Sequence, residues 1–260
     1  MKLIVIKIGG NIIDDKDKLS AFLQSFSAID EHKILVHGGG KIATQLGKKL
    51  GIEANYVNGR RITDKETLDL VTMVYGGLIN KQIVAQLQQA GCNAIGLTGA
   101  DGAIIPAVKR PVKEVDFGFV GDVKSEGVKG DLLKKLLDAG LVPVLAPLTY
   151  DEQGGMLNTN ADTIAQEVAK SLSAFMEVQL IYCFEKNGVL LDAEDDDSVI
   201  NKISIDDFEE LKTSNIISAG MIPKLENAFT AIKDGVNKVT IGHAADLYNL
   251  ISGNAGTCIQ

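Results

Sequence analysis

Short apolar runs alternate with longer amphipathic segments along most of the chain. Six runs are candidates for strands: residues 3–8 (LIVIKI), 33–37 (KILVH), 94–97, 141–148, 178–184 and 238–241. Strands separated by helical segments are typical of a mostly parallel sheet that is covered by helices. The pattern therefore predicts an α/β fold. A length of 260 residues permits either one large domain or two modest lobes.

The segment 63–90 is the clearest helix in the sequence. Thr63 and Glu66 have the spacing of a capping box, and Gly91 provides a stop. A helix of this length extends roughly 40 Å at ~1.5 Å per residue. We expect part of its apolar stripe to contact a second subunit; a long helix buried in its own core is the alternative. The pair Gly76-Gly77 permits a bend or a close backbone approach.

Two further regions complete the expected organisation. Residues 104–128 alternate in polarity and contain glycines, which predicts a β-hairpin ribbon that overhangs a site. A helix over 162–172 then leads into a second series of strands and helices. We place a soft boundary near residue 175, which gives lobes of residues 1–175 and 176–260.

Charge and cysteine content exclude several classes of function. The net charge is −8 and the pI is near 5.0, so the surface repels nucleic-acid backbones and anionic lipids. No apolar run reaches the length of a membrane span. Three separated cysteines without a C-x-x-C pair argue against a disulfide framework or a zinc site. They fit a reducing compartment, and we expect a cytoplasmic protein.

Lys7 lies inside an otherwise apolar strand, directly before Gly9-Gly10. A buried ammonium without a partner is costly, so a strand interior should contain one only for a reason. At the carboxyl end of a parallel strand, Lys7 would face the crevice in which such sheets bind ligands. The alternative is an edge-strand lysine whose head reaches water.

The segment His37 to Lys41 (HGGGK) joins a strand to an apparent helix. A glycine-rich turn at a helix N-terminus favours an anion, because free N–H groups and the helix dipole both point at it. The dinucleotide fingerprint also requires an acidic residue about twenty positions on. Residues 56–61 (YVNGRR) offer none, and no P-loop motif is present. We therefore expect a phosphate site that is not of the NAD-binding or P-loop type.

Three more polar stretches are candidates for chemistry. The neighbouring Arg60 and Arg61 offer forked guanidinium groups that grip carboxylates, although one of them could simply face solvent. Residues 155–162 place two amides and Asp162 ahead of a helix, where capping explains one polar residue better than three. Lys224 falls in the first turn of another helix, at the end where the dipole disfavours a cation. Nearby phosphate would make that position favourable.

In this order and at these spacings the motifs resemble those of the acetylglutamate kinases of the amino acid kinase superfamily. The matching pieces are IKIGGN (Ile6–Asn11), HGGGK (His37–Lys41), NGRRIT (Asn58–Thr63), GFVGDV (Gly118–Val123), NTNADT (Asn158–Thr163) and GMIPK (Gly220–Lys224). The resemblance covers essentially the whole chain. It implies an open αβα sandwich with an N-terminal acyl-amino-acid-binding and dimerisation lobe and a C-terminal nucleotide-binding lobe. It also implies phosphorylation of the side-chain carboxylate of N-acetyl-L-glutamate by ATP with Mg²⁺, in arginine biosynthesis.

The resemblance also implies roles for individual residues. Lys7 and Lys224 would stabilise the phosphoryl group in flight, with Asp162 orienting both. The substrate-binding residues would be Gly39, Gly40, Arg61, Asn158 and Asn160. The nucleotide-binding residues would be Gly9, Gly10, Glu185, Gly188 and Lys224, and no protein side chain would form a metal site.

The sequence departs from the family pattern at two places. Glu185 stands where most relatives have Asp, and Ala219 replaces the Asp of a D-G-M-I segment. Arginine-inhibited relatives carry an extra N-terminal helix, whereas here the first strand begins almost at Met1. We therefore expect a homodimer that arginine does not inhibit.

Two alternatives remain open at this point. One is the same chemistry on another small acid, such as N-succinyl-L-glutamate, free glutamate, aspartate or carbamate. A succinyl group would need a further cation, for which Lys109, Arg110 and Arg60 are candidates. The other alternative is a catalytically silent nucleotide or amino-acid sensor, which would need affinity but no charge compensation in a transition state.

Overall fold

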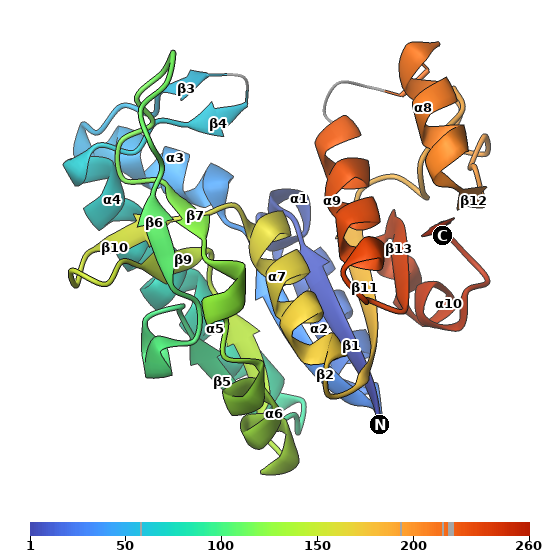
Figure 1. Ribbon diagram of the computed structural model, residues 1–260. Coiled ribbons are helices and arrows are strands. Elements are labelled where there is room, and N and C mark those ends of the chain that lie inside the picture. The colour runs from blue at the N-terminus through green and yellow to red at the C-terminus, as the bar shows by residue number, and fades with distance from the viewer. Residues whose placement is uncertain (58, 193, 215, 218–220) are drawn as a thin grey trace.

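The computed structural model describes residues 1–57, 59–192, 194–214, 216–217 and 221–260 (Figure 1). Among these residues, eight strands form one central sheet. In sheet order they are β12 (Lys202–Ile203), β14 (Thr257–Ile259), β13 (Lys238–His243), β11 (Glu177–Phe184), β1 (Lys2–Ile8), β2 (His32–His37), β8 (Val142–Leu145) and β5 (Ala94–Leu97). Neighbours from β13 to β5 are parallel, and β14 runs antiparallel to β13. The expected mostly parallel sheet is confirmed.

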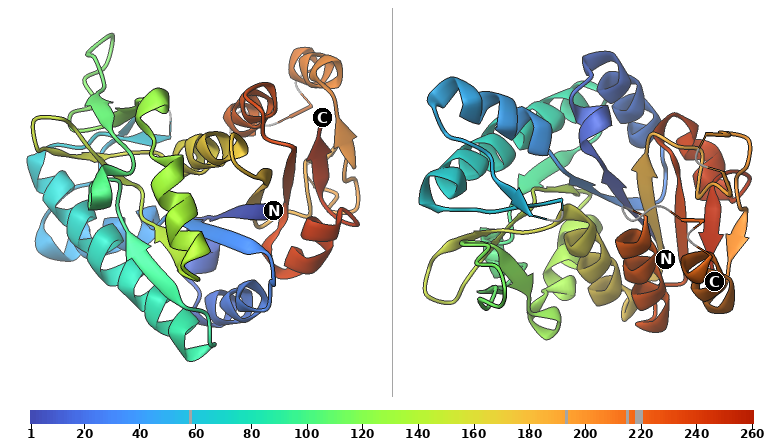
Figure 2. Two further views of the ribbon diagram at one scale, coloured as in Figure 1. Left: turned by 60° about the horizontal axis from the view of Figure 1, so that its bottom comes forward. Right: turned by 90° about the horizontal axis from the view of Figure 1, so that it is seen from above.

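Helices cover both faces of the sheet, as Figure 2 shows. One face packs against α6 (Gly130–Asp138), α7 (Ala161–Ser173), α8 (Ile205–Thr213) and α9 (Ile222–Lys233). The other packs against α1 (Gly10–Ile13), α2 (Lys16–Ser27), α3 (Gly40–Leu50), α4 (Lys65–Val71), η1 (Thr72–Ile79), α5 (Asn80–Gln89) and α10 (Leu247–Ser252). The expected αβα sandwich is therefore confirmed. The boundary expected near residue 175 falls between α7 and β11, and the one sheet continues through it.

The alternation of side chains in β1 decides where Lys7 points. Leu3 and Val5 belong to the core on the α7 face, whereas Ile4 and Ile6 belong to the core on the α2 face. Lys7 continues the first series, because successive strand residues face opposite sides. Since β1 is hydrogen-bonded to β11 on one side and to β2 on the other, the edge-strand alternative for Lys7 is wrong.

The expected long helix over 63–90 exists, but its start and interior differ from the prediction. The N-cap is Asp64, whose side chain accepts from the Thr67 N–H, and not Thr63. Helix α4 continues through η1, a π-helical segment, into α5. Gly91 follows with φ +77°, as expected of a terminating glycine. A Cβ on Gly76 would lie 3.3 Å from Leu148, so the expected close approach is confirmed there.

The ribbon expected over 104–128 is also present. Strands β6 (Ala107–Lys109) and β7 (Gly121–Val123) pair antiparallel within it. Gly118 has φ +70°, and a Cβ there would lie 2.2 Å from the Thr63 carbonyl oxygen, so only glycine fits. Further pairs are β3 (Tyr56–Val57) with β4 (Arg60–Arg61), and β9 (Leu148–Tyr150) with β10 (Met156–Asn158). Short 3₁₀ turns are η2 (Asp101–Ala103), η3 (Ser125–Gly127) and η4 (Ala244–Asp246).

One strand prediction was wrong in extent. Residues 141–148 were expected to form a single strand, but β8 ends at Leu145 and β9 begins at Leu148. Pro147 lies in the interruption and has no N–H to donate to a sheet. In the described part of the chain, none of the helices has both the length and the apolar character that a bilayer crossing requires. Cys92, Cys183 and Cys258 are all free thiols.

Candidate active site

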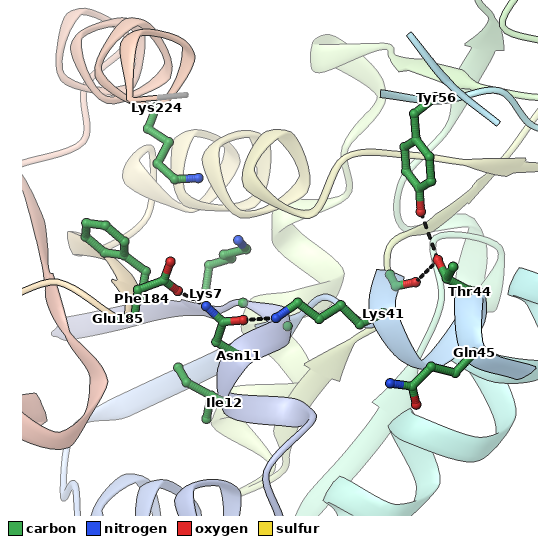
Figure 3. A pocket seen from close by; sticks show the side chains of 13 residues that line it. Lys7, Asn11, Ile12, Lys41, Thr44, Gln45, Tyr56, Phe184, Glu185 and Lys224 are labelled. Carbon is green, nitrogen blue, oxygen red and sulfur yellow. Dashed lines mark hydrogen bonds between the residues drawn. The ribbon is translucent and has the colours of Figure 1, made fainter. Parts of the chain in front are cut away.

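Two lysines that lie far apart in the sequence meet at one carboxylate. The Lys7 Nζ lies 2.6 Å from Oδ1 of Asp162, and the Lys224 Nζ lies 3.4 Å from Oδ2. The Lys7 contact is a short ion pair between part-buried side chains. Lys7 comes from the carboxyl end of β1, Asp162 from the first turn of α7 and Lys224 from the first turn of α9. Figure 3 shows both lysines extending into the same space.

The two cations keep Asp162 ionised. Burial alone would raise the pKa of this carboxyl, but the charges of Lys7 and Lys224 outweigh it, and the pKa lies below its ordinary value. Asp162 in turn stabilises the charge of Lys224, because a cation in the first turn of α9 is otherwise disfavoured by the helix dipole. Asp162 supplies the compensating charge, so the three groups form one interdependent cluster.

The two glycine turns lie side by side next to this cluster. The Gly38 N–H donates to the Ile8 carbonyl oxygen at 3.1 Å, which joins the end of β2 to the turn after β1. Gly39 has φ +153°, and a Cβ there would lie 2.3 Å from Ile79, so the position requires glycine. No atom lies within 4 Å of a Cβ placed on Gly40 among the described residues. The space beside Gly40 is therefore open at the N-terminus of α3, where the free N–H groups of a helix favour an anion.

His37 supports this turn as a neutral side chain. Burial lowers its pKa to about 4, against the opposing effect of a hydrogen bond to Gly38. The ring Nδ1 lies 2.8 Å from the Gly38 carbonyl oxygen, and Nε2 lies 3.2 Å from Nδ2 of Asn80. Because the Asn80 amide nitrogen can only donate, Nε2 is the acceptor and Nδ1 carries the proton. His37 therefore orients the glycine turn and does not carry charge at neutral pH.

A cavity of about 640 Å³ opens on one side of the lysines, and we call it the phosphate cavity. Among the described residues its lining includes three lysines: Lys7, Lys41 and Lys224. Figure 3 shows the three lysine side chains extending toward the cavity from different elements. The described residues that line it are Lys7, Gly9, Gly10, Asn11, Ile12, Gly40, Lys41, Thr44, Gln45, Tyr56, Phe184, Glu185 and Lys224.

A second cavity, of about 560 Å³, opens on the other side, and we call it the acid cavity. Its lining includes three arginines, Arg60, Arg61 and Arg110, together with the amides Asn158 and Asn160. The two cavities share a set of lining residues: Lys7, Gly40, Tyr56 and Lys224. Both lysines therefore stand where the two cavities adjoin.

Arg61 is a buried and firmly held cation of the acid cavity. It is only 8% exposed, and its Nη2 donates to the Gly40 carbonyl oxygen at 2.9 Å and to Oγ1 of Thr44 at 2.7 Å. Its guanidinium lies 4.8 Å from the ring centre of Tyr56. Among the described residues, the buried Nη1 has no hydrogen-bond partner. A buried donor without a partner is costly, so this atom is suited to receive a carboxylate.

The two asparagines of the NTNADT motif have different surroundings. The Nδ2 of Asn158 donates to Oγ1 of Thr63 at 3.0 Å, and its side chain lines the acid cavity. The Oδ1 of Asn160 accepts from the Asp162 N–H at 2.7 Å and so caps α7. Asn160 therefore holds the helix that carries Asp162, and its expected contact with substrate stays a prediction.

The expected nucleotide-binding residues divide in the same way. Gly9, Gly10, Glu185 and Lys224 line the phosphate cavity. Gly188 is not among its described lining residues; a Cβ there would lie 2.7 Å from Val199, so packing accounts for the glycine. Its role in binding nucleotide stays a prediction. Asn58, Ala219 and Gly220 of the family motifs lie outside the described residues.

Sequence reasoning gave no role to several residues that the structure brings to the site. Asn11 and Lys41 stood inside recognised motifs, and Lys41 carried the same signal as Lys224, a cation in the first turn of a helix. Tyr56 and Thr44 gave no signal. Their hydroxyl groups lie 2.9 Å apart beside Arg61 only because the short pair β3–β4 folds over α3.

The cations and glycine turns of the site suit a polyphosphate and a carboxylate. A metal ion would need the phosphates of a bound nucleotide as additional ligands. The described residues contain no group of three or more His, Cys, Asp or Glu side chains placed to hold a metal ion. Magnesium usually takes one or two carboxylates together with substrate phosphates and water. The arrangement therefore fits a cation that arrives with a nucleotide.

The sequence matches a known protein family over most of its length. Residues 2–243 match the model of the amino acid kinase family. An acetylglutamate kinase of Bacteroides thetaiotaomicron is 59% identical over 100% of this chain and 98% of its own length. One of Cytophaga hutchinsonii is 58% identical over 97% of this chain and 96% of its own length.

A solved structure extends the likeness of the fold. Carbamate kinase from Giardia lamblia bound to AMP-PNP superposes with a TM-score of 0.73 over 99% of this chain and 97% of its own length. At 14% identity, this likeness concerns the fold alone. The extent of the family match and the identity to the curated relatives show that the chain belongs to the amino acid kinase family, and within it to the acetylglutamate kinases.

Proposed function

We propose that this chain transfers the γ-phosphoryl group of ATP to the side-chain carboxylate of N-acetyl-L-glutamate, as a step of arginine biosynthesis. The product is an acyl phosphate. The names of the relatives support the reaction, and one structural observation carries it: Asp162 holds Lys7 and Lys224 where the phosphate cavity meets the acid cavity.

The chemistry asks the protein for position and charge rather than for a covalent intermediate. Phosphoryl transfer develops charge on the equatorial oxygens of a group held in line between two oxygens. Lys7 and Lys224 compensate that charge, and the backbone N–H groups of Gly39 and Gly40 donate to the same oxygens. Asp162 fixes both ammoniums beforehand, so little reorganisation is needed during transfer.

The two reactants are both anions, and the site concentrates cations for each. On the acid side, Arg61 directs its unpaired Nη1 to the α-carboxylate of the substrate, and Asn158 binds the substrate backbone. On the nucleotide side, Gly9 and Gly10 leave room for phosphates because they lack side chains. Mg²⁺, bound with the nucleotide, neutralises part of the phosphate charge.

A second substrate has specific support. Arg60 and Arg110 line the acid cavity in addition to Arg61, but Arg110 is already paired with Asp122 at 2.7 Å, so of these two it is Arg60 that offers a place for one more carboxylate. Lys109, the third candidate cation, lies over the Phe119 ring at 4.5 Å and is not among the described lining residues. N-succinyl-L-glutamate is therefore the alternative acceptor. Kinetic comparison of the two acyl-glutamates would decide: a higher kcat/KM for the succinyl substrate would replace the acetyl proposal.

A function as a silent sensor is less well supported. A sensor gains nothing from two part-buried ammoniums on one carboxylate, whose use lies in stabilising charge in transit. We therefore keep the sensor only as a possible outcome of the activity test.

The test is formation of acyl hydroxamate from ATP, Mg²⁺, hydroxylamine and N-acetyl-L-glutamate. We expect hydroxamate in proportion to enzyme, with none when free glutamate replaces the acylated substrate. Nucleotide binding without any hydroxamate from either acyl-glutamate would favour the sensor and refute the kinase.

We also propose a cytoplasmic homodimer. Met73 and Leu78 on η1 are 59% and 43% exposed, which leaves apolar surface on the helix expected to meet a second subunit. Light scattering should give the mass of two chains, and a monomer or hexamer would contradict this arrangement. The free thiols fit a reducing compartment.

A further inference from the structure

We propose that Lys41 binds the phosphates that remain on the nucleotide during transfer, and that Asn11 positions it for this task. The proposal rests on the nucleotide-binding part of the proposed function. It adds a third cation to the site and assigns it a role different from those of Lys7 and Lys224.

A chain of contacts across the phosphate cavity holds the Lys41 side chain in place. Its Nζ donates to Oδ1 of Asn11, and Nδ2 of Asn11 donates to Oε2 of Glu185 (Figure 3). A cation on one side and an anion on the other fix which way the Asn11 amide faces. The chain joins α3, α1 and the loop after β11, so it crosses the cavity from one wall to the other.

The stem of Lys41 lies along the turn that is expected to line the phosphates. A Cβ on Gly10 would lie 4.0 Å from Cγ of Lys41, whereas a Cβ on Gly9 would lie 3.9 Å from Nζ of Lys7. The two glycines therefore separate the two lysines. Lys7 and Lys224 share Asp162, so we assign both of them to the phosphoryl group that is transferred. We assign Lys41 to the phosphates that stay on the nucleotide.

A purely structural role for Lys41 is poorly supported. Its other charged neighbour is Asp14, with an Nζ to Oδ2 distance of 3.8 Å, which is an ion pair and not a hydrogen bond. Burial raises the pKa of Asp14, and the charge of Lys41 opposes that rise only in part. The Lys41 side chain is also 62% exposed, so an incoming anion can reach its Nζ where Asn11 holds it.

The direct test is equilibrium binding of AMP-PNP and of ADP to the full-length chain, measured by calorimetry without turnover. Lys41→Met should weaken both nucleotides about tenfold, as expected for loss of one charge-assisted contact. Lys48→Met is the matched control, because Lys48 lies in the last turn of the same helix, and it should bind both normally. Lys41→Arg should restore most of the affinity.

Kinetics separate binding of the retained phosphates from transfer. In Lys41→Met we expect a raised KM for ATP, an unchanged KM for the acyl-glutamate and a kcat within about threefold of the parent chain. A kcat loss as large as that of Lys224→Met would overturn the assignment to the retained phosphates.

Asn11→Ala tests the positioning role. It should raise the KM for ATP less than Lys41→Met, and combining the two changes should add little to the lysine change alone. Fully additive effects would show that Asn11 does not act through Lys41.

The outcomes also distinguish this inference from the function on which it rests. If the parent chain fails to bind AMP-PNP, the proposed kinase function fails as well. If the parent chain binds it and Lys41→Met binds it equally, only the assignment of Lys41 is overturned.

Discussion

The acid cavity and the phosphate cavity differ in how firmly the protein holds their charged groups. Arg61 is buried and donates to two oxygen atoms, whereas Glu185 is exposed and Lys41 has most of its side chain in solvent. Ordering an exposed lysine costs rotamer entropy that a buried, hydrogen-bonded arginine has already lost on folding. We infer that the acid end is formed before substrate arrives, and that the nucleotide completes the other end.

The largest effect is expected where the two cavities meet. Lys7→Met and Lys224→Met should each lower kcat about 10²–10³-fold, because each removes a preorganised charge from the transition state. Lys233→Met, at the far end of α9, is the control and should leave kcat unchanged. Hydroxamate assays at saturating substrates measure the effect. Near-normal turnover in either site variant would refute the role of that lysine.

A change in the acid cavity should alter the affinity for the acid substrate. Arg61→Ala should raise the KM for N-acetyl-L-glutamate about 10- to 100-fold while the KM for ATP changes little, because a charged hydrogen-bond donor to the substrate is lost. The neighbouring Arg60→Ala serves as the control with the acetylated substrate, for which only a small change is expected. If both variants kept the KM of the parent chain, a preformed carboxylate clamp would be excluded.

The preformed end also predicts a dependence of stability on pH. The pKa of His37 is about 4 in the folded chain against an ordinary 6.5, so protons bind the unfolded chain more readily. The stability from neutral His37 is therefore complete above pH 6.5 and is lost as the pH falls toward 4. The full loss is on the order of 3 kcal/mol.

Urea unfolding between pH 7 and pH 4 measures this effect. His37→Asn should be less stable at pH 7 and should lose less stability on acidification than the parent chain. His32→Asn, at the half-buried start of β2, is the control and should follow the parent. Parallel curves for His37→Asn and the parent would contradict the buried neutral histidine.

The smallest effect is expected at the exposed acid of the nucleotide end. Glu185→Gln keeps an oxygen that can accept from Asn11, so the KM for ATP should change less than about fivefold, in keeping with an exposed charge. Steady-state kinetics with varied ATP measure it, and kcat should stay unchanged. A large loss of kcat would show that this carboxylate takes part in transfer, and the contrast between the two ends would then disappear.

The buried part of the site was predictable because buried charge is rare. Lys7 stood out in an apolar strand, and Asp162 stood out ahead of a helix, so the sequence alone indicated both. Their meeting with Lys224 depends on the parallel order of β1, β11 and β13. The sequence pattern predicted a mostly parallel sheet but not the order of its strands. The layered α/β fold was predictable because short apolar runs alternate with amphipathic segments along the chain.

The parts that were missed depend on choices between similar local options. Thr63 and Asp64 can both cap a helix, and the tertiary bridge from Thr63 to Gly118 left the cap to Asp64. Tyr56 reaches Arg61 through a two-residue strand that no period reveals. Lys41 carried the same first-turn signal as Lys224 but was overlooked as a site residue, because exposed lysines are common and the glycines before it already explained the motif.

The account depends most on one shared ligand for Lys7 and Lys224. A crystal structure with ADP, Mg²⁺, aluminium fluoride and N-acetyl-L-glutamate would place a planar mimic of the phosphoryl group between the two cavities. We predict that the Nζ atoms of both lysines lie within about 3 Å of the same fluoride group. A mimic contacted by only one of them, or bound away from the junction, would contradict the mechanism.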